Sequence, residues 1–210
     1  MARLSLANFD FENKAKADGF AVVAGVDEVG RGCLAGAVVA AAVVFESEDH
    51  VPEGVNDSKQ IPKDKREELA ELIKQRALTF AFAEVDQSIV DKINILEATR
   101  LAMITAVGKL DPAADFLLID AVQLTACPLP QRSIIKGDAA SASIAAASII
   151  AKVHRDNVMA EFDLLYPQYG FARHVGYGTP EHLDALRLHG PCPLHRLSFR
   201  GVIQPELGFE

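Results

Sequence analysis

The stretch FAVVAGVDEVGRGCLAGAVVAAAVVF, residues 20–45, carries the pattern that decides the fold. Its two apolar runs, 20–29 and 35–45, are rich in valine, a residue that favours β-strands. A short break that contains two glycines separates the runs at 30–32. Two strand-like runs joined in this way are typical of a β-hairpin or of two strands in a tight pair.

The rest of the chain mixes helical and strand-like patterns. Helical patterns cover 63–77, 88–110, 139–165 and a last helix between Thr179 and Gly190, and strand-like runs cover 79–85, 116–119 and 133–135. Because strands and helices do not alternate strictly, a mixed sheet is favoured over a fully parallel one. We predict an α/β fold with a mixed central sheet flanked by helices and a helical C-terminal extension. One domain would cover 1–210, with its α/β core at about 19–165 and the extension at about 166–210.

Composition describes an ordinary globular protein. The 210 residues are 50% hydrophobic and 24% charged, which excludes a disordered tail, a collagen and a disulfide miniprotein. Three cysteines lie far apart, as expected in a reducing compartment. The N-terminus does not look like a secretory signal, and the longest apolar run, 33–45, is too short to span a bilayer. We expect a cytoplasmic protein without a membrane segment.

The formal net charge of −8 argues weakly against nucleic-acid binding. It does not exclude such binding, because a local basic stripe is sufficient and clustered acids can be balanced by metal ions. The sparse basic residues predict few phosphate contacts and a shallow dependence of affinity on salt.

The glycines near the first strand resemble a dinucleotide-binding fingerprint, Gly30-x-Gly32-x-x-Ala35. In that motif the glycines open a helix whose N-terminus faces a pyrophosphate. Here a valine-rich strand pattern follows instead, and Asp27 and Glu28 would repel the anion. A nucleotide-cofactor site is therefore disfavoured.

Acidic residues follow or end three separate strand patterns. Asp27 and Glu28 come just before the glycine break, Asp120 ends the run 116–119, and Asp138 precedes an Ala- and Ser-rich helix. Taken singly, Asp120 is an ordinary turn former and Asp138 an ordinary helix N-cap. Taken together, four acids at one edge of a sheet are typical of a site for divalent metal ions. Both interpretations stay open on spacing alone.

Several motifs together resemble the bacterial ribonuclease HII family. They include Asp27-Glu28-Val29-Gly30-Arg31-Gly32, Asn56-Asp57-Ser58-Lys59, Lys136-Gly137-Asp138, Ala145-Ala146-Ala147-Ser148-Ile149, Tyr169-Gly170-Phe171 and Gly176-Tyr177. The resemblance runs from about residue 20 to 199, with the motifs in the family's order. The related ribonuclease HIII branch carries an extra N-terminal domain, for which too few residues precede Asp27.

The resemblance implies an enzyme with a ribonuclease H-like fold. Members of the family hydrolyse the RNA strand of RNA–DNA hybrids and nick duplex DNA 5′ of a single embedded ribonucleotide, leaving 5′-phosphate and 3′-hydroxyl ends. The family's catalytic, metal-binding acids correspond to Asp27, Glu28, Asp120 and Asp138. The implied cofactor is Mg²⁺ or Mn²⁺, with two ions in the catalytic complex. The implied role is removal of misinserted ribonucleotides and RNA primers.

The resemblance also implies a set of substrate-binding residues. The 2′-hydroxyl is assigned to Gly30, Arg31 and Gly32, phosphates to Lys59, Lys152, Arg196 and Ser198, and the sugar at the RNA–DNA junction to Tyr177. As alternatives, Arg31 would be a surface residue in a turn, the lysines ordinary solvated charges, and Tyr177 a core tyrosine.

One departure from the family pattern and two rival functions remain. The family usually has glycine after its third acid, where this chain has Ala121. A non-catalytic hybrid-binding module and a metal-dependent phosphatase for small molecules are the rivals. We expect a monomer, and no feature identifies a replication or transcription partner that would recruit it.

Histidines crowd the C-terminal part of the chain and raise the question of a zinc site. They are His174, His182, His189 and His195. They lack the spacing of a paired zinc motif, so we expect them on helix faces or in solvent. The three cysteines are expected to be structural.

Overall fold

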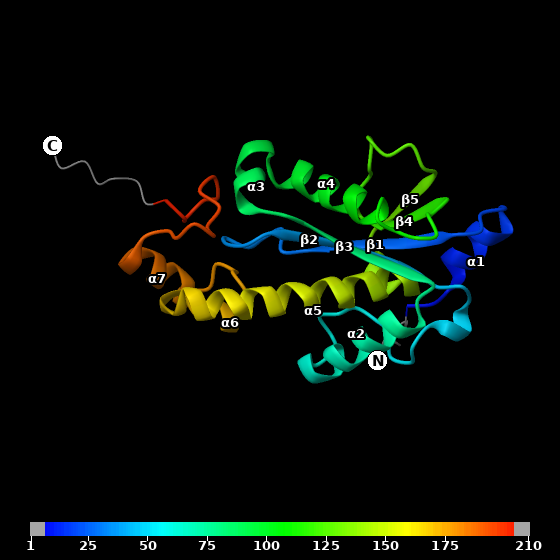
Figure 1. The fold of residues 1–210 in the computed structure, drawn as a ribbon, viewed down its shortest axis with the longest axis horizontal. Helices are drawn as coiled ribbons and strands as arrows, with labels where there is room; N and C mark the ends of the chain where they lie inside the picture. Colours follow the sequence, from blue (N-terminus) through cyan, green and yellow to red (C-terminus); the bar gives the residue numbers. More distant parts are fainter. Residues whose placement is uncertain (1–6, 204–210) are drawn as a thin grey trace.

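The computed structural model describes residues 7–203, in which a five-stranded sheet is covered by helices on both faces (Figure 1). The strands are β1 (Val23–Val29), β2 (Val38–Val44), β3 (Thr79–Val85), β4 (Phe116–Asp120) and β5 (Gln131–Ile134). Their order across the sheet is β3-β2-β1-β4-β5. The β3–β2 and β2–β1 pairs are antiparallel, whereas the β1–β4 and β4–β5 pairs are parallel. The predicted mixed sheet is confirmed.

The helices are numbered in the order in which they occur along the chain. They are α1 (Asp10–Ala17), α2 (Lys63–Arg76), α3 (Gln87–Ile93), α4 (Ile95–Val107), α5 (Ala142–Leu165), α6 (Phe171–His174) and α7 (Pro180–His189). Figure 1 shows α3 and α4 on one face of the sheet and α2 and α5 on the other.

Strand β2 is buried along its whole length because helices cover both of its faces. Val38 and Ala40 belong to the hydrophobic cluster that includes Met103 of α4. Val39 and Ala41 belong to the cluster on the α5 side. This alternation is the two-residue period of a strand, so the valine-rich sequence fills two cores at once.

Helix α5 crosses β1 at Gly25 with almost no space between them. A Cβ atom at Gly25 would lie 2.1 Å from the carbonyl carbon of Ser143. The small side chains in the first half of α5 and the missing side chain at Gly25 therefore allow the close approach. As a result, Ser148 and Lys152 of α5 lie near the end of β1.

The predicted single helix over 88–110 is wrong, because two helices occupy this segment. They meet at Asn94, whose φ of 69° lies in the left-handed region. The Asn94 side chain accepts hydrogen bonds from the backbone N–H groups of Leu96 and Glu97, which caps the N-terminus of α4.

Helix α1 was not predicted from the sequence. Its Glu12 is fully buried and accepts hydrogen bonds from the Ser141 hydroxyl (2.6 Å) and the Ser143 N–H (2.9 Å). Glu12 thereby ties the N-terminal helix to the start of α5.

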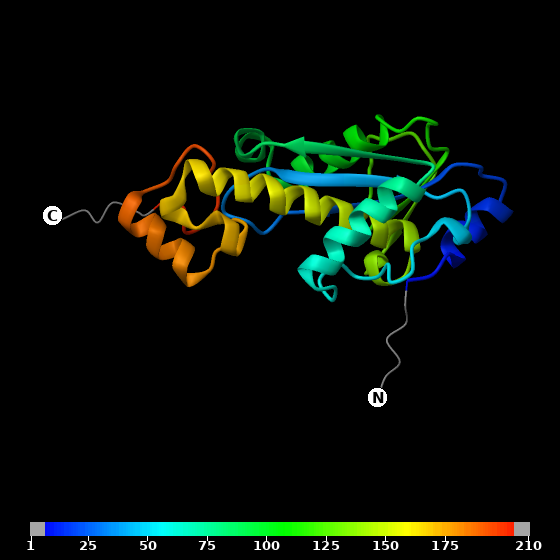
Figure 2. The ribbon, with the colours of Figure 1, turned by 60° about the horizontal axis from the view of Figure 1, so that its bottom comes forward.

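The C-terminal segment packs around the far end of α5 (Figure 2). It has a hydrophobic cluster of its own, to which Leu34, Met159, Tyr169 and Phe171 belong. The ends of the predicted domain, 1–6 and 204–210, lie outside the described residues. Within 7–203, no helix is both long and apolar enough to cross a membrane.

Candidate active site

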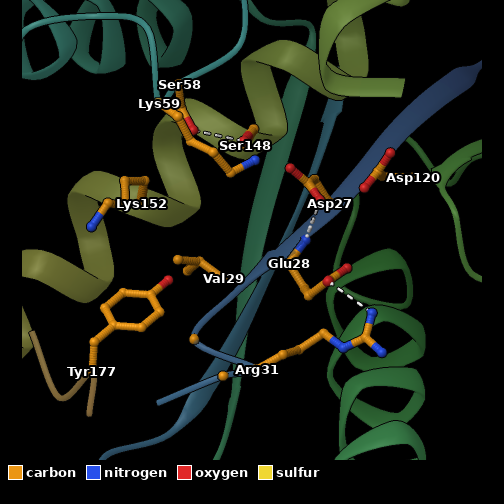
Figure 3. Close-up of a pocket in the computed structure, with 12 residues that line it drawn as sticks. Asp27, Glu28, Val29, Arg31, Ser58, Lys59, Asp120, Ser148, Lys152 and Tyr177 are labelled. Carbon is orange, nitrogen blue, oxygen red and sulfur yellow. Dashed lines mark hydrogen bonds and ion pairs between the residues drawn. The ribbon is translucent and has the colours of Figure 1, made fainter. Parts of the chain in front are cut away.

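Asp27 and Glu28 lie at the end of β1 and line one cavity with Asp120. Asp27 is only 5% exposed, and its Oδ1 accepts a hydrogen bond from the Glu28 N–H at 2.7 Å. The two side chains diverge, with Asp27 turned toward Asp120 and Glu28 toward Arg31 (Figure 3). Glu28 Oε1 lies 3.3 Å from Arg31 Nη1.

Asp120 reaches the cavity because β4 is parallel to β1 and in matching register. Ile119 pairs with Val26, so the next residue of each strand, Asp120 and Asp27, lies at the same edge. Asp120 Oδ1 accepts a hydrogen bond from the Gly137 N–H at 2.7 Å. This bond fixes the carboxylate where the parallel strands end.

Ala121 follows this acid in a left-handed conformation, with φ of 48°. The Val122 N–H bonds back to the Asp120 carbonyl at 2.5 Å, so the chain turns sharply here. Glycine adopts such a backbone at lower cost than alanine. The chain therefore keeps a glycine-type turn with an alanine in it, and the acid stays at the edge.

Asp138 lies beside the cavity but does not line it. It belongs to the short 3₁₀ turn Gly137–Ala139, and Ser141, rather than Asp138, caps α5. Asp138 Oδ2 accepts a hydrogen bond from Lys59 Nζ at 3.0 Å. Lys59 itself lines the cavity, so it links the fourth acid to the other three.

Burial and mutual repulsion raise the pKa values of the acids. Burial is the largest cause of the raised pKa of Asp27, followed by the charges of Glu28 and Asp120. Burial also raises the pKa of Glu28 against the opposing effect of Arg31. The pKa of Asp120 is raised by burial, against the hydrogen bond from Gly137. A nearby cation stabilises the ionised form of buried carboxylates that repel one another.

The donor set fits a hard divalent ion. Glu28 Oε2 is buried and has no hydrogen-bond partner within the described part of the chain. Across residues 7–203, no three carboxylate, imidazole or thiol groups converge closely enough to enclose an ion by themselves. An ion at this edge would therefore keep water ligands beside a few carboxylates, as Mg²⁺ does in proteins.

The remaining predicted residues of the cavity come from loops and from α5. Arg31, Gly32, Lys59, Lys152 and Tyr177 line it together with Gly30. Tyr177 is 41% exposed, and burial raises the pKa of its hydroxyl. Figure 3 shows its ring on the side of the cavity opposite Asp120. Lys152 Nζ turns away from the acids and lies 2.6 Å from Asp156 Oδ1.

Sequence reasoning missed Ser58 and Ser148 as members of the cavity lining. Their hydroxyls lie 2.9 Å apart and are buried. A hydrogen bond from Ser148 counteracts part of the rise in the pKa of Asp27. The signal was available, because Ser148 precedes Lys152 by four residues and thus lies on the same face of α5.

Arg196 does not present its guanidinium group to a phosphate, whereas Ser198 is exposed but lies outside the cavity. Arg196 is fully buried, with Nε and Nη2 bonded to the Gly36 carbonyl and Nη1 bonded to the Arg31 carbonyl. Ser198 donates a 2.5 Å hydrogen bond to Asp91, and neither residue lines the cavity. Arg196 instead holds the glycine-containing loop in place.

The histidines were expected on helix faces or in solvent; His174, His182 and His189 do lie in helices, whereas His195 is buried in a loop and contradicts the expectation. His174, His182 and His195 are buried, whereas His189 is exposed. His182 Nδ1 lies 2.9 Å from the Tyr177 carbonyl, and its Nε2 lies 3.0 Å from His195 Nε2. His182 is hydrogen-bonded to His195 and stacks on His174, so the three buried histidines pack together beside the Tyr177 backbone.

Solved ribonucleases H share this fold. Ribonuclease H2 from Pyrococcus horikoshii OT3 matches with a TM-score of 0.74 at 24% identity, covering 86% of this chain and 95% of that chain. Bst-RNase HIII, solved in complex with Mn²⁺, shares the fold with a TM-score of 0.64 at 20% identity, covering 86% of this chain and 68% of that chain. These likenesses place the chain in the class of ribonuclease H-like folds, with an acid-lined cavity at the edge of its sheet.

Sequence relatives narrow the class to one family. The family model "Ribonuclease HII" matches residues 24–202. Ribonuclease HII of Solibacter usitatus is 54% identical over 191 residues, covering 91% of this chain and 83% of the relative. Ribonuclease HII of Bacillus pumilus is 54% identical over 192 residues, covering 91% and 75%. The chain belongs to the ribonuclease HII family.

Proposed function

We propose that this enzyme hydrolyses the RNA strand of RNA–DNA hybrids and nicks duplex DNA on the 5′ side of a single embedded ribonucleotide. Its products would carry 5′-phosphate and 3′-hydroxyl ends. The observation that carries the proposal is that Asp27, Glu28 and Asp120 share one cavity with the 30–32 loop and Tyr177. That cavity joins acids for hydrolysis to groups that fit a sugar.

Asp27, Glu28, Asp120 and Asp138 would hold the divalent ions, Mg²⁺ or Mn²⁺ and two in number. When bound, such ions polarise water and stabilise the charge on the leaving oxygen of a phosphodiester. The chain's own contribution is to hold the acids in place. The Glu28 N–H orients Asp27 and the Gly137 N–H orients Asp120.

A lone ribonucleotide has to be recognised through its 2′-hydroxyl, because the surrounding duplex is almost entirely DNA. Gly32 has no side chain to keep backbone groups away from that sugar, and only Tyr177 lies near its missing Cβ atom, at 3.9 Å. The exposed ring of Tyr177 would pack on the neighbouring deoxyribose. A 2′-hydroxyl on that neighbour would crowd the ring. Gly32 and Tyr177 together would therefore select the RNA–DNA junction.

The test compares three duplexes: all-DNA, DNA with one ribonucleotide, and an RNA–DNA hybrid. Each is incubated with Mg²⁺, with Mn²⁺ and with a chelator, and the ends of the products are mapped. We expect a nick 5′ of the ribonucleotide only with metal, cleavage of the hybrid, and an intact all-DNA duplex.

The rival functions predict other results. Tight hybrid binding without any cleavage would identify a binding module. Turnover of a chromogenic phosphate ester, with none of a hybrid, would identify a small-molecule phosphatase.

We further propose that the enzyme acts as a monomer in the cytoplasm and removes misinserted ribonucleotides and RNA primers. Three of the four proposed catalytic acids, Asp27, Glu28 and Asp120, line a cavity whose lining residues all come from this chain, which supports a monomeric active site. Light scattering coupled to size-exclusion chromatography would measure the mass of the protein in solution. The mass of a dimer would overturn the proposal of a monomer.

A further inference from the structure

A second hollow lies beside the active-site cavity, between α2, α5 and α6. Its charged lining residues are Lys63, Arg66, Lys152, Arg173 and the single acid Asp156. Four cations around one carboxylate stand out in a chain whose net charge is −8. Lys152 lines both the hollow and the active-site cavity, so the two are adjacent.

The inner wall of the hollow is built from partly neutralised cations. Lys152 Nζ lies 2.6 Å from Asp156 Oδ1, and Arg66 Nη1 lies 3.8 Å from Asp156 Oδ2. Arg66 Nε is buried and has no hydrogen-bond partner among residues 7–203. One carboxylate thus faces two cations, which leaves positive charge and an unused donor at the wall.

The rim of the hollow carries two exposed cations. Lys63 lies 3.9 Å from Glu67, with 72% of its side chain exposed, and Arg173 pairs with Glu181. Exposed ion pairs of this kind contribute little free energy, so a phosphate can replace these partners at small cost. Arginine and lysine are the side chains that most often contact backbone phosphates.

We propose that this hollow binds a backbone phosphate of the substrate duplex, outside the phosphodiester that is cut. The inference rests on the proposed function, because it assigns a further contact to the same substrate. A net-negative protein repels DNA at long range, so a local group of cations next to the cavity is needed to hold the duplex in register. Lys152 connects this contact to the acids through the same face of α5 that carries Ser148.

The test uses the double variant Lys63→Gln/Arg173→Gln in the full chain. Its matched control is Lys65→Gln/Arg187→Gln, because Lys65 lies on the same helix as Lys63 with similar exposure and neither control residue lines the hollow. Binding of the ribonucleotide-containing duplex is measured by fluorescence anisotropy without metal, over a series of salt concentrations.

We expect the double variant to weaken binding by about 5- to 20-fold and to lower the slope of log affinity against log salt by about 1 to 2. The rate at saturating substrate should stay the same, and the control should bind within about twofold of the wild type. Equal affinity and slope in the double variant and the control would overturn the inference.

A scan with neutral methylphosphonates locates the contact. Replacing single phosphates along both strands should weaken wild-type binding at one or two positions outside the cut, and the double variant should be insensitive at those positions. Sensitivity that is the same in both proteins at every position would also overturn the inference. If the wild type does not nick the duplex at all, the proposed function fails instead, so the two failures are distinguishable.

Discussion

A Cβ atom added at Gly30 would lie 2.3 Å from Nε of Arg155. Arg155 is buried and donates hydrogen bonds to three backbone carbonyl groups, so it cannot move aside. Gly30 also has a positive φ of 92°. Gly32, only two residues further on, has no such restriction. The atom nearest to a Cβ added at Gly32 is Tyr177 Cε1, at 3.9 Å. The two glycines on either side of Arg31 therefore serve different purposes.

This difference predicts opposite outcomes for two substitutions. Gly30→Ala should lower the free energy of unfolding by about 1 to 3 kcal/mol, because it combines a clash with an unfavourable φ. Gly32→Val should keep stability within about 1 kcal/mol of the wild type, yet slow cleavage of every substrate by about tenfold or more, because the sugar can no longer approach. Urea unfolding and cleavage rates are the two measurements. A stable, fully active Gly32→Val protein would remove the loop from substrate recognition.

Asp27→Asn should abolish cleavage while leaving the metal-free protein as stable as the wild type or more stable. Burial and the neighbouring acids raise the pKa of Asp27, so its ionised form destabilises the folded state. Thermal unfolding in a chelator and a nicking assay in Mg²⁺ check the two halves. Full activity of Asp27→Asn would contradict the metal assignment.

Tyr177→Ala should slow nicking at a single ribonucleotide by about 10- to 100-fold and slow hybrid cleavage less, because a hybrid has no deoxyribose neighbour for the ring. Tyr177→Phe is the control, since it keeps the ring that packs on the sugar. Rates on both substrates are compared for the three proteins. Equal losses on both would assign Tyr177 to the fold or to general catalysis.

The buried histidines predict a stability that falls in acid. His182 Nδ1 donates to the Tyr177 carbonyl, so its Nε2 accepts from His195 Nε2, while His195 Nδ1 accepts from the Cys192 N–H. This arrangement needs both rings neutral. Burial, followed by the charge of His182, lowers the pKa of His195 from 6.5 to about 4.

Protonation of His195 therefore favours the unfolded chain. The stabilisation is complete above the unfolded pKa of 6.5 and is lost as the pH falls toward 4, by up to about 3 kcal/mol. His195→Asn keeps an acceptor near the Cys192 N–H but does not titrate, so its stability should depend less on pH across this range. Urea midpoints from pH 4 to 7 decide the matter, and parallel curves for both proteins would exclude this role of His195.

Arg196→Met should destabilise the protein by about 3 kcal/mol, because the change leaves the carbonyl groups of Gly36 and Arg31 without their hydrogen bonds. Any loss of substrate binding would follow from a misplaced loop. Unfolding by urea measures the first effect. Unchanged stability with a steeply weakened affinity would instead restore the phosphate contact expected from the sequence.

Structural features that depend on residues close together in the chain could be predicted from the sequence. The valine-rich strand pattern of β2 and the cap and end of α7 at Thr179 and Gly190 are local, and so both appeared as expected. The position of acids at the ends of β1 and β4 was also readable, because parallel strands end at the same edge. The break at Asn94 was missed because the helical pattern continues on both sides of it.

Only the tertiary structure decided which polar residues line the cavity and which are buried. Arg196 and His195 look like surface residues by composition, yet contacts across more than a hundred residues bury Arg196 against Gly36. The gathering of Lys63, Lys152 and Arg173 depends on the packing of α2 beside α5 and α6, which lie far from it in sequence. Spacing along a chain reports periodicity within one element, whereas burial and charge clustering arise from contacts between elements, which no local pattern contains.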